Sequence, residues 1–308
     1  MDGLLIVDKP AGRTSHDVVS EVRHLIRQSR VGHTGTLDPF ATGVLVLLVG
    51  HATRLAQFLK DSEKEYEAVI RFGYATDSGD VTGNILEETR LKPNLSESAI
   101  ESVLPSFHGW MDQVPPMFSA KKKGGRKLYE LARQGLNVER APVRVCIYEF
   151  EPIKSDSNLL KDNLDGTTDL KVRVICSAGT YIRTLAEELG KRLGTSAHLA
   201  ELRRTRAGEF GIDQASSLTE LKLSVDEGNL GIILLPPDAA LSTLPFVHLS
   251  DTDERRARHG QQVSAPEALR GGDPAIRMLD REGNLIGVGY FDAEKQVLLP
   301  RIVLPAPK

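Results

Sequence analysis

The sequence has 308 residues, of which 40% are hydrophobic and 26% are charged, and its net charge is −3. This length suits one large domain with a smaller one, and the composition is typical of a soluble globular protein rather than a disordered chain. No apolar run reaches the roughly 18 residues of a membrane-spanning helix, and the first ten residues lack the basic flank of a signal peptide. We therefore expect a cytoplasmic protein without a membrane segment.

The two cysteines, Cys146 and Cys176, do not form a metal-spaced pair. We expect both to be buried thiols in a reducing compartment. The sequence predicts no metal site.

The N-terminal part predicts a strand at residues 3–7 and then a helix that Thr14 opens, with Asp17 completing a capping box. Residues 32–43 cannot form a helix, because glycines and Pro39 interrupt every turn. The apolar run at 44–49 predicts a strand that is buried on both faces.

Alternating polarity from Glu65 to Phe72 predicts a strand with Tyr66 and every second residue after it on one face. A second strand is expected at 170–176. Helices are expected at 53–59, 95–104, 127–134 and 180–193, and polar loops at 77–84 and 154–168. Strands and helices without regular alternation favour an α+β fold around a mixed or antiparallel sheet.

The pattern of predicted elements changes at Pro245. We expect a helix at 253–259 and three short strands at 276–279, 285–291 and 297–303, with a hairpin loop between the first two strands. These features predict two domains, at residues 1–244 and 245–308, of which the second is small and β-rich.

Positive charge is concentrated in two places. Residues 121–144 contain eight basic side chains and two acidic ones, a net charge of +6. Arg203, Arg204 and Arg206 form a second cluster. Such clusters are suited to contacting phosphates, but a solvated charged face explains them equally well.

Asp38 lies in the glycine-rich segment, directly before Pro39 and a buried strand. Pro39 restricts Asp38 to extended geometry, so the loop could present one carboxylate rigidly at the edge of a sheet. Asp-Pro also commonly caps a turn, and spacing alone favours that interpretation. Residues 32–35 match the GXXG pattern of KH domains, but so short a match is common by chance.

The whole segment Gly-His-Thr-Gly-Thr-Leu-Asp-Pro-Phe-Ala-Thr-Gly-Val-Leu, at residues 32–45, resembles the signature of the TruB family of pseudouridine synthases. Further family motifs follow in order. These are Asp-Lys-Pro at 8–10, Lys-Glu-Tyr at 64–66, Gln-Val-Pro-Pro-Met-Phe-Ser-Ala at 113–120, Cys-Ser-Ala-Gly-Thr-Tyr-Ile-Arg at 176–183 and His-Leu-Ala-Glu-Leu-Arg-Arg-Thr at 198–205. The resemblance covers residues 3–205, and the C-terminal part fits the small RNA-binding PUA barrel less specifically.

The resemblance implies isomerisation of uridine to pseudouridine without a metal or other cofactor. The family's catalytic aspartate falls on Asp38, which attacks either C1′ of the sugar or C6 of the base. Its basic partner falls on Arg183, which is expected to orient the carboxylate and to lower its pKa. The stacking tyrosine falls on Tyr66, whose phenol can also move a proton.

The family's remaining substrate-binding positions fall on four residues. Tyr181 resembles a second contact to the base, and the backbone of Leu202 is expected to read uracil. His33 resembles the histidine that fills the gap left by the extruded nucleotide. Lys9 is expected to pack or orient the catalytic loop.

The resemblance also implies RNA contacts. Residues 114–144 correspond to the family's RNA-clamping insertion, in which Gly124 and Gly125 are expected to confer flexibility. Expected contacts to the RNA backbone are Lys121, Lys122, Lys123, Arg126, Lys127, Arg203, Arg204 and Arg206.

The insertion and the Gly-His-Thr-Gly sequence fit the bacterial stand-alone enzymes, which modify uridine 55 in the T arm of tRNA. We therefore expect a monomer that needs no protein partner. The alternatives are a guide-RNA-dependent enzyme and a non-catalytic RNA-binding protein or tRNA chaperone. A retaining glycosidase is disfavoured, because no second carboxylate is evident beside Asp38.

Overall fold

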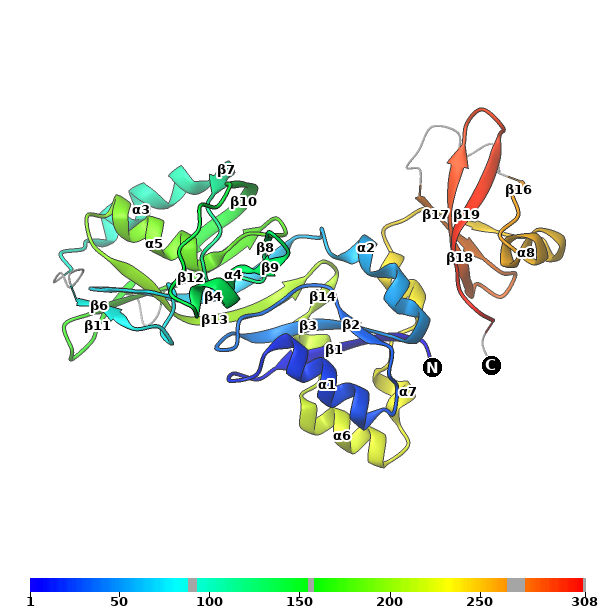
Figure 1. The fold of residues 1–308 in the computed structure, drawn as a ribbon, viewed down its shortest axis with the longest axis horizontal. Helices are drawn as coiled ribbons and strands as arrows, with labels where there is room; N and C mark the ends of the chain where they lie inside the picture. Colours follow the sequence, from blue (N-terminus) through cyan, green and yellow to red (C-terminus); the bar gives the residue numbers. More distant parts are fainter. Residues whose placement is uncertain (88–92, 155–157, 265–274, 307–308) are drawn as a thin grey trace.

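The computed structural model describes residues 1–87, 93–154, 158–264 and 275–306. In this part of the chain, ten strands form one large sheet and five form a second sheet at the C-terminal end (Figure 1). Seven strands of the large sheet lie in the order β1-β3-β13-β4-β12-β10-β7. They are β1 (Gly3–Lys9), β3 (Thr42–Val49), β13 (Ala197–Ala207), β4 (Lys64–Phe72), β12 (Thr168–Cys176), β10 (Val143–Pro152) and β7 (Gly109–Gln113). The edges carry β2 (Val31–His33), β11 (Leu160–Asp162) and β14 (Phe210–Gly211).

The large sheet is mixed. Its paired strands are antiparallel except for β13 and β3, which are parallel where Arg203 lies opposite Thr42 and Arg204 opposite Gly43. This confirms the predicted α+β fold with a mixed sheet. The strand β13 was not predicted, and it lies in the interior of the sheet, between β3 and β4.

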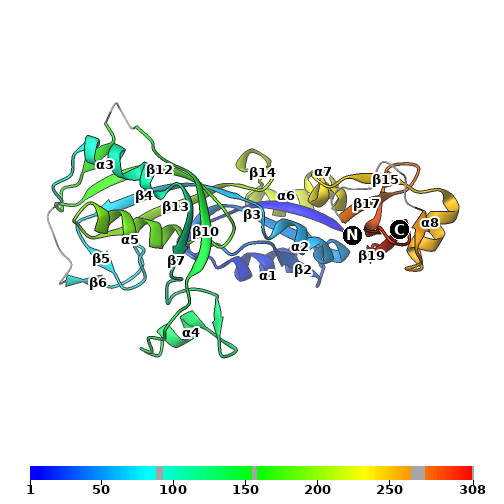
Figure 2. The same cartoon turned by 90° about the horizontal axis from the view of Figure 1, so that it is seen from above.

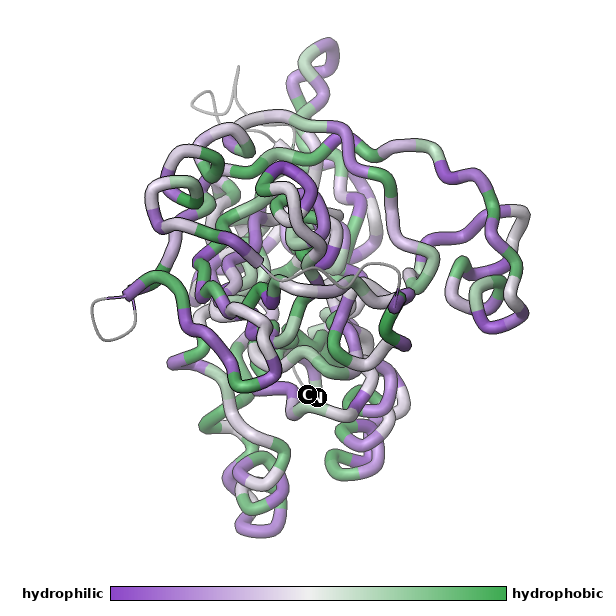
Figure 3. The backbone as a smooth tube through the Cα atoms, turned by 90° about the vertical axis from the view of Figure 1, so that its left-hand side faces the viewer, coloured by the Kyte–Doolittle hydropathy of each residue, from purple (hydrophilic) through white to green (hydrophobic). Residues whose placement is uncertain are grey.

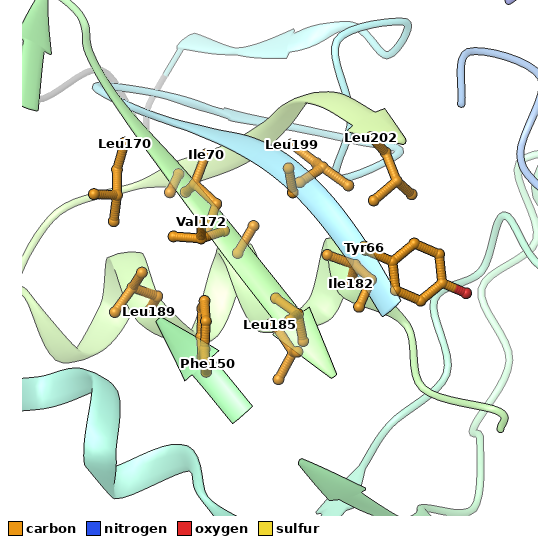
Figure 4. Close-up of a cluster of buried hydrophobic side chains, with 14 of the residues drawn as sticks. Tyr66, Ile70, Phe150, Leu170, Val172, Ile182, Leu185, Leu189, Leu199 and Leu202 are labelled. Carbon is orange, nitrogen blue, oxygen red and sulfur yellow. The ribbon is translucent and has the colours of Figure 1, made fainter. Parts of the chain in front are cut away.

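Helix α5 (Ile182–Arg192) covers one face of β4, β12 and β13 (Figure 4). The alternation predicted for β4 is confirmed, because Tyr66, Ala68, Ile70 and Phe72 are all buried on this face. Leu185 and Leu189 of α5 pack beneath them. Burial of such side chains stabilises the fold by roughly 1.5–3 kcal/mol each.

Helix α1 (Ser15–Leu25) packs on β1 and β3 at the other end of the sheet, beside α6 (Leu218–Asp226). The predicted capping box is present, since the Asp17 N–H donates to Thr14 Oγ1 and the Thr14 N–H to the Asp17 carboxylate. The strand predicted at 44–49 is buried throughout.

Three predicted segments differ in detail. Residues 53–59 begin as the 3₁₀ helix η1 (Gly50–Leu55) and continue as α2 (Ala56–Leu59). The helix expected at 95–104 is α3 (Glu97–Val103), which continues as η3 (Leu104–Phe107). The loop prediction for 154–168 is wrong at β11, because this edge strand is polar and lacks apolar alternation.

The basic insertion projects from the body of the protein (Figure 2), and the backbone coloured by hydropathy shows hydrophilic and hydrophobic residues interspersed along the chain (Figure 3). It contains a hairpin of β8 (Lys122–Lys123) and β9 (Arg126–Lys127), followed by α4 (Leu128–Ala132). Gly124 and Gly125 form the turn with φ of 58° and 82°. Positive φ at both central residues is typical of a type I′ hairpin turn, which favours glycine.

The C-terminal sheet has the order β15-β17-β18-β19-β16 and curls into a half-barrel beside α8 (Asp251–Arg258) (Figure 1). Its strands are β15 (Phe246–His248), β16 (Val263–Ser264), β17 (Ala275–Leu279), β18 (Leu285–Asp292) and β19 (Val297–Val303). The remaining elements are β5 (Ala75–Thr76), β6 (Ile85–Leu86), η4 (Ile212–Gln214), α7 (Leu230–Ile233) and η5 (Pro237–Leu241). None of the helices in the described ranges is long and apolar enough to cross a membrane.

Candidate active site

The loop that carries Asp38 joins β2 to β3. Leu37 and Ala41 anchor it in the core, with exposed fractions of 3% and 0%. At its end Gly43 has a φ of 100°, and a Cβ there would lie 2.2 Å from the Arg204 carbonyl oxygen. Only glycine fits so close to the crossing strand, so the backbone fixes where the loop meets the sheet.

Lys9 is fully buried beneath this loop. Its ammonium group donates to the carbonyl oxygens of Pro10 (2.9 Å), Arg13 (2.6 Å) and Pro39 (3.2 Å). Burial lowers the pKa of Lys9 to about 8. Lys9 thus has the contacts expected of a residue that orients the loop, and it has no exposed surface with which to contact a substrate directly.

Arg204 is also buried, with an exposed fraction of 2%. Its guanidinium donates to the carbonyl oxygens of Val44 (2.7 Å) and Gly35 (3.0 Å) and lies 3.5 Å from that of Thr36. The structure therefore contradicts the expectation that Arg204 contacts RNA phosphates. Strand alternation explains the difference, because Arg204 shares the inward face of β13 with Leu202, while Arg203 faces outward to Asp8.

Asp38 and Arg183 form a two-point ion pair. Arg183 Nε lies 2.9 Å from Asp38 Oδ2, and Arg183 Nη2 donates to Oδ1 at 3.2 Å. The Arg183 side chain is 3% exposed, whereas that of Asp38 is 31% exposed. This fork fixes the plane of a carboxylate whose outer side stays accessible.

The rest of the Arg183 guanidinium is held by three groups from distant parts of the chain. Its Nη1 donates to the Ser78 carbonyl (2.8 Å) and its Nη2 to the Phe118 carbonyl (2.8 Å). The Asp80 carboxylate lies 3.6 Å from Nη1. Sequence reasoning missed Asp80, although the acidic turn at 77–84 was the signal that could have marked it.

The pKa of Asp38 differs from the expectation. Burial raises it, and the Arg183 guanidinium opposes that rise. The balance lies above the ordinary value for an aspartate, because the nearby Asp80 charge adds to the effect of burial. The prediction that Arg183 lowers the Asp38 pKa is correct for the pairwise effect and wrong for the net shift.

A cavity of about 240 Å³ opens beside the ion pair. Its lining includes Asp38, Tyr66, Tyr181, Arg183 and Leu202, which the sequence analysis had expected to act together. One water occupies roughly 30 Å³, so a group the size of a nucleobase fits. Figure 4 shows Tyr66 and Leu202 at the same end of the hydrophobic cluster, with the Tyr66 hydroxyl directed away from it.

Tyr66 is 7% exposed and belongs to the core cluster as well as to the cavity. Burial raises its pKa, which keeps the phenol protonated. Burial also raises the pKa of Tyr181. Both rings therefore offer neutral aromatic faces to the cavity.

Lys64 is a further cavity residue that sequence reasoning did not single out. It is 6% exposed, and its ammonium group donates to the Ser62 hydroxyl (2.9 Å) and carbonyl. Burial lowers its pKa to about 8, and the Arg204 charge adds to this effect. Within the described ranges it has no carboxylate partner.

His33 lies on β2, opposite Leu47 of β3. It does not line the cavity beside Asp38. Burial lowers its pKa, and no hydrogen-bond partner of its Nδ1 is found in the part of the chain that the structure describes. The geometry leaves its expected role in replacing the extruded nucleotide untested.

The basic insertion presents exposed side chains at Lys121, Lys122, Lys123 and Arg126, with Lys127 partly exposed. Arg203 and Arg206 lie outside the insertion and pair with Asp8 and Glu63 at 2.7 Å and 2.6 Å. The insertion is therefore the better candidate for phosphate contacts.

Family models match this chain over most of its length. The N-terminal domain of the TruB family pseudouridylate synthases matches residues 23–182. The tRNA pseudouridylate synthase B C-terminal domain matches 183–242, and the C-terminal model of pseudouridine synthase II TruB matches 245–304.

Curated relatives agree. A protein of Dechloromonas aromatica named tRNA pseudouridine synthase B is 43% identical over 94% of this chain and 91% of its own length. A Bacillus pumilus protein of the same name is 40% identical over 87% of this chain and 85% of its own.

Among solved structures, the Cbf5-Nop10-Gar1 complex contains a chain with a TM-score of 0.72 and 25% identity, covering 98% of this chain and 85% of that one. The archaeal box H/ACA sRNP Nop10-Cbf5 complex gives a TM-score of 0.71, also at 25% identity, and covers 99% and 88%. The motifs, the fold and these matches agree, and the chain belongs to the TruB family of pseudouridylate synthases.

Proposed function

We propose that this protein converts uridine 55 in the T loop of tRNA to pseudouridine, with Asp38 as the nucleophile. The observation that carries the proposal is the Asp38 carboxylate, held at two points by Arg183 on the wall of a cavity that Tyr66 lines. The relatives at 40% identity or more are named tRNA pseudouridine synthase B, which supports tRNA as the substrate.

The reaction moves one glycosidic bond within one nucleotide. The bond between N1 and C1′ breaks, the base rotates, and a bond between C5 and C1′ forms. The hydrogen on C5 leaves and N1 gains a proton, so atoms and electrons balance without an oxidant. Ionised Asp38 attacks either C1′ or C6 and is released at the end, and both routes use the same carboxylate.

The surrounding residues position the base and restrain the nucleophile. Tyr66 and Tyr181 offer faces on which uracil can stack, an interaction worth about 1–3 kcal/mol per base. Arg183 holds the carboxylate in one orientation, so its orientational freedom is already restricted before the substrate enters. The Leu202 backbone is suited to reading the edge of the base.

The target uridine lies within a folded loop and must be extruded, which costs a few kcal/mol. Phosphate contacts from the insertion at 114–144 offset this cost. The C-terminal half-barrel at 245–308 is a PUA-like domain that adds a second RNA contact. We infer a cytoplasmic monomer that acts on the T arm without a protein partner.

Guide-RNA-dependent modification is the weaker alternative. The matched chains of the Cbf5-Nop10-Gar1 and Nop10-Cbf5 complexes cover this chain almost completely, but at 25% identity against 43% for the Dechloromonas protein. A retaining glycosidase is disfavoured for a geometric reason. Asp80 is the second carboxylate near Asp38, yet it is 4% exposed and does not line the cavity.

Tritium release from a T-arm RNA labelled at C5 of uracil tests the proposal. The wild type should release tritium without any guide RNA, and Asp38→Asn should not. Equal release from the two proteins would remove Asp38 from the mechanism. No release from the wild type would favour a non-catalytic RNA-binding protein.

A further inference from the structure

Gln113 is a buried amide, 2% exposed, between the basic insertion and the active site. Its Oε1 accepts from the Tyr181 backbone N–H at 2.7 Å, and its Nε2 donates to the Tyr181 carbonyl at 3.0 Å. This side chain thus forms both hydrogen bonds with the main chain of one residue. Such a pair fixes distance and direction together.

The position of Gln113 in the fold gives these bonds a consequence. Gln113 is the last residue of β7 and pairs with Val143, the first residue of β10. The chain between them is the insertion, so Gln113 lies at its neck. Tyr181 is the N-cap residue of α5, and Arg183 is the second residue of that helix.

A second link runs in the same direction. The Phe118 carbonyl, in the first leg of the insertion, accepts from Arg183 Nη2 at 2.8 Å. The same nitrogen donates to Asp38. The path of the insertion therefore determines one acceptor of the guanidinium that holds the nucleophile.

We propose that Gln113 is a positioning residue that couples the basic insertion to the Asp38–Arg183 pair. Placement of the insertion on RNA is then transmitted through Gln113 to the start of α5 and to Arg183. This inference rests on the proposed roles of Asp38 and Arg183.

Burial makes the coupling effective. Arg183 is 3% exposed, so water cannot replace an acceptor that moves away. A displaced insertion leaves a buried donor of a charged group unpaired, and the fork to Asp38 must adjust. Tight packing around such a group favours discrete arrangements over gradual drift.

The test uses Gln113→Met, which keeps the volume of the side chain and removes both hydrogen bonds. At saturating T-arm RNA, the single-turnover rate should fall by roughly tenfold or more, since small displacements of catalytic groups have effects of this size. The dissociation constant for the RNA should stay within about threefold, because the basic side chains are unchanged. The acid limb of the pH–rate profile should move to higher pH, because a displaced Arg183 lowers the pKa of Asp38 less.

Gln134→Met is the matched control. Gln134 lies in the same insertion and is exposed, and within the described ranges its side chain bonds only Arg126. The same substitution there should leave the saturating rate unchanged, because this side chain has no bond to Tyr181 or Arg183. Gln113→Glu keeps the acceptor for the Tyr181 N–H but sets a second acceptor against the Tyr181 carbonyl, so its rate should also fall below that of the wild type.

An unchanged saturating rate in Gln113→Met overturns the proposal, and so does weaker RNA binding with a wild-type saturating rate. If Gln113→Met fails to fold, a wild-type rate in folded Gln113→Glu overturns it. The proposed function is judged separately by the wild type and Asp38→Asn. Tritium release by the wild type alone supports it whatever Gln113→Met does.

Discussion

Asp80 and Asp38 lie on different nitrogens of one buried guanidinium, at 3.6 Å and 2.9 Å from Arg183. Asp80 accepts hydrogen bonds from the Ser78 hydroxyl (2.9 Å) and the Thr82 hydroxyl (2.6 Å). It is therefore a fixed negative charge behind the ion pair. Its charge raises the pKa of Asp38, so it makes the proposed nucleophile more basic.

Asp80→Asn should keep the hydrogen bonds from Ser78 and Thr82 and remove the charge. The pKa of Asp38 should fall, so the acid limb of the single-turnover rate should move to lower pH. The plateau rate should decrease, by about tenfold, because a less basic carboxylate is a poorer nucleophile and Arg183 is less well held. A pH profile at saturating RNA checks this, and an acid limb at higher pH would contradict it.

Substitution of Arg183 should move the acid limb in the opposite direction. Arg183 lowers the pKa of Asp38, although burial outweighs this effect. In Arg183→Met the pKa of Asp38 should rise further, so the loss of activity on acidification should begin at a higher pH than in the wild type. Arg183→Lys retains the charge and should shift the limb less, while the lost fork still reduces the rate. Identical acid limbs in the two variants would argue against electrostatic control of Asp38.

Arg203 and Arg204 are neighbours in the sequence but lie on opposite faces of β13. Arg204 is buried and holds three carbonyl groups, whereas Arg203 is partly exposed and pairs with Asp8. Arg204→Met should lower the free energy of unfolding by roughly 3 kcal/mol, because buried acceptors lose a charged donor. Arg203→Met, the matched control, should change it by less than about 1 kcal/mol. Urea denaturation of both variants measures the difference, and equal losses would contradict the assignment.

The same pair shows where sequence reasoning stopped. The alternation in β4 and the capping box at Thr14 were readable because local pattern determines them. The strand Ala197–Ala207 carries arginines on both faces, so its pattern does not reveal which of them is buried. A mixed charge pattern of this kind cannot show a strand at the centre of a sheet.

The residues of the proposed active site were predictable from the sequence only in part, because only some of them lie in recognisable motifs. Asp38, Tyr66 and Arg183 fall within the sequence motifs that resemble the TruB signature, and the structure brings them to one cavity. Asp80 contacts Arg183, which lies 103 positions later in the sequence, and Gln113 contacts Tyr181, which lies 68 positions later. The pairing of β7 with β10 places Gln113 beside the start of α5, and the turn between β5 and β6 carries Asp80 to the same helix, so these contacts depend on the tertiary fold.

Lys64 should make stability depend on pH in the alkaline range. Its pKa is about 8 in the folded protein against 10.5 ordinarily. Between pH 7 and pH 9 the folded state releases this proton and the unfolded state keeps it, so the free energy of unfolding should rise by about 1 kcal/mol. Lys64→Met cannot show this rise. Its stability relative to the wild type should therefore decrease by about 1 kcal/mol from pH 7 to pH 9, as measured by urea denaturation. A difference that does not change with pH would contradict the buried, titrating ammonium group.

The insertion should contribute to RNA affinity through charge alone. Lys121, Lys122 and Lys123 are exposed, and none has a carboxylate partner within the described ranges. Replacing all three with alanine should weaken T-arm RNA binding and flatten the slope of log affinity against log salt, because fewer counterions are released on binding. The rate at saturating RNA should stay close to wild type, which separates this effect from the loss expected of Gln113→Met.

The matched control for this triple variant uses three exposed basic residues outside the insertion and outside the C-terminal half-barrel, in Arg13→Ala, Lys171→Ala and Arg192→Ala combined. They pair with Glu21, Glu67 and Glu188 at 2.7 Å, 2.8 Å and 3.3 Å. Neutralising partnered charges outside the insertion should alter the salt slope less. An equal slope for the wild type and the lysine triple variant would show that the insertion binds RNA by shape instead of by its charge. The salt-dependent part of the affinity would then have to come from basic residues other than these three lysines.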